Sequence, residues 1–124
     1  MKTINIRAGS LSLPAELNES LTAQKIWAAL PIEGSANRWG DEIYFDIPVS
    51  STEEPGAHQD MQVGDLAYWP VGSAFCIFFG PTPVSHGDQP RAYSPVNVVG
   101  RLAGDARLFR QVKDGERVFL EKTE

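Results

Sequence analysis

The segment from Gly64 to Gly100 constrains the fold of this chain more than any other part of the sequence. It contains two short strands, expected over residues 66–69 and 74–79, that are rich in apolar and aromatic side chains. Strands that are apolar on both faces need cover on both sides, as in a closed barrel. The loop that follows, residues 80–95, is rich in proline. A proline-stiffened loop over aromatic strands predicts the rim of a binding pocket.

The rest of the chain alternates short strands with turns. Period-two alternation predicts further strands over residues 4–8, 11–13, 42–47, 96–102 and 117–121. Residues 33–37 and 49–60 are expected to be loops, the second of them mobile. Gly100, inside a strand, indicates a bulge or a close approach of another backbone.

Two helical segments are expected. Ala23, Ile26, Trp27 and Leu30 form one apolar stripe of a helix of about three turns, with Ser20 or Thr22 as its cap. Asp105 can cap a single helical turn through residue 109. The strands follow one another too closely for helical crossovers, so the sheet should be mostly antiparallel. The sequence therefore predicts a mainly β fold: a small closed barrel with one α-helix at an open end and a short helical turn.

Length and charge limit the possible classes of function. The 124 residues fit a single domain, residues 1–124. A net charge of −5 disfavours nucleic acid and anionic membranes as partners. The opening residues read as a strand, not as a signal peptide, so we expect a soluble, cytoplasmic protein.

The sequence shows no pattern typical of a bound metal or cofactor. Cys76 is the only cysteine, which excludes an internal disulfide and indicates a small buried thiol. His58 and His86 have no metal-ligand spacing, and there is no phosphate-binding glycine loop. We therefore expect neither a metal nor a cofactor.

Four separated blocks resemble a known family. They are NRWGDEIYF at residues 37–45, the run from Gly64-Asp65 to Trp69-Pro70, FFG at 78–80 with Thr82-Pro83, and VNVVG at 96–100. In this order and spacing the chain resembles the small prokaryotic cyclophilin-like family over roughly residues 2–121. The resemblance implies a cyclophilin-type β-barrel. It implies less about activity, because one fold hosts unrelated functions.

Peptidyl-prolyl cis-trans isomerase is one function that the resemblance suggests. That reaction must lower a barrier of ~20 kcal/mol, using an apolar slot for proline and a cationic donor near the prolyl nitrogen. Arg38 maps onto the arginine that true cyclophilins place ahead of a pocket strand. The histidine and tryptophan expected late in the isomerase pocket are absent after Val96. Arg38 is therefore a catalytic candidate only if the protein is an isomerase.

A binding pocket without chemistry is the preferred interpretation. Its partner would be a small molecule or a short peptide, held by aromatic faces and a few polar groups. Tyr68 and Trp69 point to opposite faces of one strand, so only one of them can line a given pocket. The candidate binding residues are Trp39, Asp41, Glu42, Tyr44, Tyr68, Phe78, Thr82, Pro83, Ser85 and Asn97. A non-catalytic subunit of a larger enzyme is a third possibility, which would show as a broad exposed apolar patch.

Overall fold

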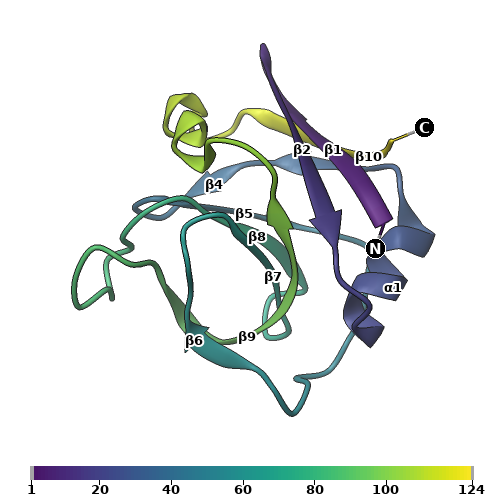
Figure 1. The fold of residues 1–124 in the computed structure, drawn as a ribbon, viewed down its shortest axis with the longest axis horizontal. Coiled ribbons are helices and arrows are strands. Elements are labelled where there is room, and N and C mark those ends of the chain that lie inside the picture. Colours follow the sequence, from purple (N-terminus) through teal and green to yellow (C-terminus); the bar gives the residue numbers. More distant parts are fainter. Residues whose placement is uncertain (1, 124) are drawn as a thin grey trace.

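A computed structural model describes residues 2–123 and shows a mainly β fold wrapped around one principal core (Figure 1). The two helical segments are the α-helix α1 (Leu21–Ala29) and the 3₁₀ helix η1 (Ala106–Gln111). The strands are β1 (Lys2–Ala8), β2 (Leu11–Leu17), β3 (Ile32–Ser35), β4 (Asn37–Arg38), β5 (Glu42–Asp46), β6 (His58–Asp60), β7 (Asp65–Trp69), β8 (Ala74–Phe78), β9 (Arg91–Leu102) and β10 (Arg117–Lys122).

All strand pairs within residues 2–123 are antiparallel, as predicted. The strands follow the order β3-β10-β1-β2-β9-β7-β8-β5-β4, and β6 pairs with β9 off this path. The order is open, with β3 at one end and β4 at the other, so the expected closed barrel is not formed. Only Ala36 separates β3 from β4 along the chain, and its N–H and C=O bond to Glu116 and Gly115 instead. The sheet therefore curls round, as Figure 1 shows, without a ladder joining its ends.

Both predicted helical segments form with the expected caps. The Ser20 side chain accepts a hydrogen bond from the N–H of Ala23, and the Asp105 side chain accepts one from the N–H of Arg107. Ala23 and Ile26 of α1 are buried in the main core, which confirms the apolar stripe. Within residues 2–123, no helix is long and apolar enough to span a membrane.

Strands β7 and β8 bury both of their faces, as their composition predicts. Tyr68, Phe75 and Ile77 belong to the main hydrophobic core, together with residues of β1, β2, β10 and α1. Ala67, Cys76 and Phe78 belong to a second, smaller cluster on the opposite face. This second cluster also contains Met61, Ala92 and Val96. The split follows from the alternation of side chains along a strand.

Three short strands and the first half of a long one were not expected from the sequence. Residues 33–37, predicted as a loop, contribute to β3 and β4. The end of the predicted mobile loop is β6, which pairs with β9. Strand β9 begins at Arg91, so the proline-rich loop is shorter than predicted. Strands of two to four residues carry too little periodicity to be recognised, and their partners define them instead.

Candidate functional site

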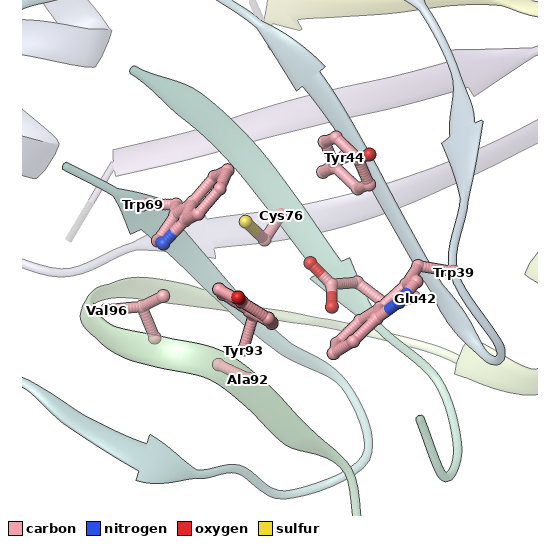
Figure 2. Close-up of a pocket in the computed structure, with 8 residues that line it drawn as sticks. All are labelled: Trp39, Glu42, Tyr44, Trp69, Cys76, Ala92, Tyr93 and Val96. Carbon is pink, nitrogen blue, oxygen red and sulfur yellow. The ribbon is translucent and has the colours of Figure 1, made fainter. Parts of the chain in front are cut away.

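A cavity of about 180 Å³ lies over the second hydrophobic cluster. Strands β5, β7, β8 and β9 form its walls, and the turn between β4 and β5 adds one further side chain. Figure 2 shows the lining residues, with the Glu42 carboxyl group in the middle of the surrounding rings. These residues are Trp39, Glu42, Tyr44, Trp69, Cys76, Ala92, Tyr93 and Val96.

Strand β5 directs two polar side chains toward the cavity because its residues alternate. Glu42 and Tyr44 line the cavity, whereas Ile43 and Phe45 belong to the main core. The turn before β5 places Trp39: its N–H donates to the carbonyl of Glu42 at 3.0 Å, and the N–H of Glu42 donates back at 3.2 Å. Gly40 occupies this turn with φ of +62°, which favours glycine.

Four aromatic rings line the cavity, and one of them, Tyr93, is 68% exposed. They form a chain of edge-to-face contacts: Trp39 to Tyr93 at 6.0 Å, Tyr93 to Trp69 at 6.2 Å, and Trp69 to Tyr44 at 6.4 Å between ring centroids. The interplanar angles of 74–83° show that neighbouring rings are nearly perpendicular to one another. The Trp69 indole N–H donates to Ser94 Oγ at 2.7 Å, which fixes the orientation of that ring.

Glu42 is the only acidic residue that lines this cavity, and it is 5% exposed. Its Oε1 atom is buried without a hydrogen-bond partner. Burial raises the pKa of Glu42 from 4.5 to about 7, and the neighbouring Cys76 thiol lowers that pKa in part. Burial and the Glu42 charge in turn raise the pKa of Cys76, so the thiol stays protonated. A carboxyl group that titrates near neutral pH thus faces an apolar, aromatic space.

Among the sequence-predicted site residues, the structure brings Trp39, Glu42 and Tyr44 together in the cavity. Asp41 lies outside it and pairs with Arg38 at 3.4 Å and with Arg110 at 3.2 Å.

The other two aromatic candidates are buried and do not line the cavity. Tyr68 is in the main core, where its hydroxyl donates to the carbonyl of Val49 at 2.7 Å. Phe78 is fully buried in the second cluster. Of the pair on β7, Trp69 lines the cavity and Tyr68 does not.

The polar candidates in the proline-rich loop stabilise the loop itself. The N–H of Thr82 donates to Ser85 Oγ at 2.9 Å, and the Ser85 hydroxyl donates to the carbonyl of Gln89 at 2.8 Å. Pro83 is exposed. Its Cδ atom packs close to Gly40, 3.0 Å from the position that a Cβ atom would occupy there. None of these three residues is among the residues that line the cavity.

Asn97 has a structural role on the other side of β9. Its amide donates to Thr22 Oγ1 at 3.1 Å and to the carbonyl of Thr52 at 3.0 Å, and its Oδ1 accepts from the N–H of Glu54 at 2.8 Å. These bonds tie the segment 49–57, predicted as mobile, to α1 and β9.

Arg38 points away from the cavity. Its guanidinium donates to the carbonyls of Gly40, Arg110 and Val112, and it lies 5.1 Å from the centroid of the Phe79 ring. With its pairing to Asp41, these contacts occupy the guanidinium in holding η1 against the turn before β5.

Sequence reasoning missed five lining residues as site residues, namely Trp69, Cys76, Ala92, Tyr93 and Val96. The sequence does point to Trp69, because Tyr68 and Trp69 lie on opposite faces of β7 and only one of them can line the pocket. Cys76 is buried, as predicted, and its place opposite Tyr44 in the β5–β8 ladder brings it to the cavity. Tyr93 and its neighbours lie in the part of β9 that was expected to be a loop.

Comparisons with known proteins agree with this fold. A family model described as Cyclophilin-like matches residues 2–121. The solution structure of the hypothetical protein AF2241 from Archaeoglobus fulgidus is similar, with a TM-score of 0.82 and 41% sequence identity. That alignment covers 98% of this chain and 95% of the archaeal one.

A more distant likeness is to the structure of McbB in complex with tryptophan, with a TM-score of 0.72 and 16% identity. The alignment covers 97% of this chain but 44% of McbB, and at this identity it shows the fold alone. A search of curated proteins found no match.

Proposed function

The chain belongs to the cyclophilin-like family, and from that premise we propose that it binds a small molecule in the aromatic cavity. The family supplies the fold and not the function, so the function is argued from the site. The observation that carries the proposal is the buried Glu42 carboxyl group, which lines a space walled by four aromatic rings and whose Oε1 atom has no hydrogen-bond partner. Leaving a buried polar atom unpaired costs roughly 1–3 kcal/mol. A bound ligand that donates to the carboxyl group would offset part of that cost.

The shape of the cavity supports a compact ligand. Concave, mostly apolar sites with a few convergent polar groups are typical of small-molecule binding. A cavity of about 150 Å³ accepts benzene, so a space of about 180 Å³ admits one small ring or a branched alkyl group.

The two alternative functions have less support. An isomerase would need a cationic donor in the cavity, but the Arg38 guanidinium is occupied by backbone carbonyls and Asp41. A subunit of a larger enzyme would present a broad apolar patch. The exposed large apolar side chains of residues 2–123 come from four separate elements, namely Leu21, Val71, Tyr93 and Leu108.

The test is a fragment screen by protein NMR with small aromatic and branched alkyl compounds. We expect binding to shift the indole N–H signals of Trp39 and Trp69 and to leave that of Trp27 unchanged. Trp27 lies elsewhere, with Lys2 and Lys122 over its ring, and serves as an internal control. A screen in which no compound perturbs the two cavity tryptophans would count against the proposal.

Trp39→Ala should weaken binding of any compound found in this way at least tenfold. Because Trp39 is only half-buried and lies on a turn, the same substitution should cost little folding stability. Urea denaturation measures the second quantity. Phe45→Ala, which removes a fully buried ring, is the matched control and should lose about 3–5 kcal/mol. A comparable loss in Trp39→Ala would mark Trp39 as part of the core and not of a binding wall.

A further inference from the structure

We propose that the cavity selects an organic ammonium ion, one that donates an N–H to the Glu42 carboxylate while its carbon substituents lie against the aromatic rings. This inference rests on the proposed function and names the chemical class of its ligand. It follows from the juxtaposition of a buried, unpartnered carboxylate oxygen and four rings set nearly perpendicular to one another.

The arrangement of rings favours a cation. The negative face of an aromatic ring attracts an ammonium group within about 6 Å of its centroid, and the attraction grows when water is excluded. The four rings stand at 74–83° to their neighbours and line the same cavity as the Glu42 carboxyl group. In Figure 2 the rings of Trp39, Trp69 and Tyr93 surround the Glu42 carboxyl group. A cation at this point would contact faces and carboxylate together.

The side chains that line the cavity provide no counter-ion for Glu42. Glu42 is the one charged side chain among the lining residues, which include no lysine, arginine or histidine. The nearby basic residues are engaged elsewhere: Arg38 and Arg110 with Asp41, and Arg91 with Asp60. An ionised carboxylate in such surroundings is costly unless a cation pairs with it. The missing partner is therefore a positive charge and not only a hydrogen-bond donor.

The need for an N–H separates this ligand from a quaternary ammonium ion. The Glu42 carboxylate can accept a hydrogen bond, and charge-assisted bonds of this kind are about twice as strong as neutral ones. A quaternary ion would satisfy the rings and the charge but would leave the carboxylate without a donor. Protonated primary, secondary or tertiary amines satisfy all three.

The titration of Glu42 adds a pH signature. The titratable groups that face its carboxyl are the Cys76 thiol from β8 and the phenols of Tyr44 and Tyr93 from β5 and β9. Because the pKa of Glu42 is about 7, the carboxyl group is largely neutral below that pH and ionised above it. An ammonium ion binds the ionised form, so its affinity should fall as pH decreases below 7, by up to tenfold per pH unit.

The experiment compares benzylammonium chloride with benzyl alcohol, which has nearly the same shape and a donor but no charge. Both are titrated into the protein at about pH 8, where benzylamine still carries its proton, and followed through the Trp39 and Trp69 indole signals. We expect benzylammonium to bind at least tenfold more tightly than the alcohol. We expect tetramethylammonium to bind more weakly than trimethylammonium, because it lacks the N–H.

Glu42→Gln tests the origin of the preference. This variant keeps the shape and an acceptor oxygen but removes the charge, so the two benzyl probes should bind it with similar affinity. Glu33→Gln is the matched control: it removes a charge of the same kind from an exposed pair with Arg117 and should leave the preference intact.

The outcomes separate the two proposals. Equal affinity of both benzyl probes for the unmodified protein, or a preference for the cation that survives in Glu42→Gln, would overturn the ammonium assignment and leave the binding function standing. If neither the benzyl probes nor the methylammonium probes shift the cavity signals at any pH tested, both proposals fail. A preference that is lost both in Glu42→Gln and at about pH 5 would support the assignment.

Discussion

Glu42 shows how a single residue can serve a site at a cost to the fold. Its carboxyl group is buried, one of its oxygens is unpaired, and its pKa is raised to about 7. In the unfolded chain the same group is solvated and titrates near 4.5. The folded protein therefore holds this proton more tightly than the unfolded chain does. Stability at neutral pH is lower than it would be with a neutral side chain at this position.

Glu42→Gln should therefore raise the free energy of unfolding, and the gain should depend on pH. A folded pKa above the unfolded one gives a stability contribution that is complete below pH 4.5 and lost as pH rises through 7. The difference of about 2.5 pKa units corresponds to roughly 3 kcal/mol. Urea denaturation of both proteins at about pH 4, 5.5 and 8 should show the advantage of the variant growing across this range. A gain of the same size at every pH would show that Glu42 does not titrate as its burial implies.

At the scale of elements, β9 determines where the cavity lies. Its second half pairs with β7 and β2, while its first half pairs with β6 and carries three lining residues. The change of partner lies between Val96 and Asn97, and the pairing with β7 has a register shift opposite Leu66 and Ala67, near Gly100. A Cβ atom at Gly100 would lie 2.1 Å from the carbonyl oxygen of Glu16 on β2. The sequence-based expectation of a bulge or a close approach at Gly100 is confirmed in both respects.

Gly100→Ala should destabilise the protein by at least about 2 kcal/mol, because the clash is with backbone and cannot be relieved by a side-chain rotation. Chemical denaturation measures this loss. Gly56→Ala is the matched control, since a Cβ there meets nothing within 4 Å, and it should leave stability almost unchanged. Equal stability of the two variants would mean that β2 and β9 are not in close contact at this point.

The elements that sequence predicts well are those with a clear apolar pattern. Strand β5 and the helix α1 were expected close to their observed bounds because alternation runs through the first and an apolar stripe through the second. Strands β7 and β8 were expected because each is a short run that is apolar on both faces. The alternation in β5 places Glu42 and Tyr44 on the cavity face and Ile43 and Phe45 in the main core. The first half of β9 was not predicted, because Pro90 and Pro95 favour a loop locally and only the pairing with β6 makes it a strand. Tyr93 was missed for that reason, whereas Val96 begins the strand that was expected over residues 96–102.

At the scale of the whole molecule, the first and last strands lie side by side. Strands β1 and β10 are paired, and the N–H of Thr123 donates to the carbonyl of Thr3 at 3.2 Å. The fold is thus completed by contacts between the first and last segments in sequence. Proteins rich in such distant pairings fold slowly, in milliseconds to seconds.

A circular permutant should show that the fold depends on the pairing of β1 with β10 and not on where the chain begins and ends. Joining the ends by a short glycine-serine linker and opening the chain between Gly87 and Asp88, in an exposed loop, should preserve the fold. Thermal unfolding followed by circular dichroism, with an NMR spectrum of the backbone amides, should match the parent closely. The control permutant, opened between Val98 and Val99 within β9, should not fold cooperatively. If the first permutant failed as well, the order of segments along the chain would itself be essential.

Neighbouring residues of β7 and β8 face different clusters, so one set of positions in these strands builds the main core and the other set builds the cavity. Tyr68, Phe75 and Ile77 face the main core, while Trp69 and Cys76 face the cavity. Mutations at alternate positions can therefore alter the lining of the cavity while the architecture is maintained by the positions between them. Descendants of one ancestral chain could in this way diverge in the shape of the cavity without passing through unfolded intermediates.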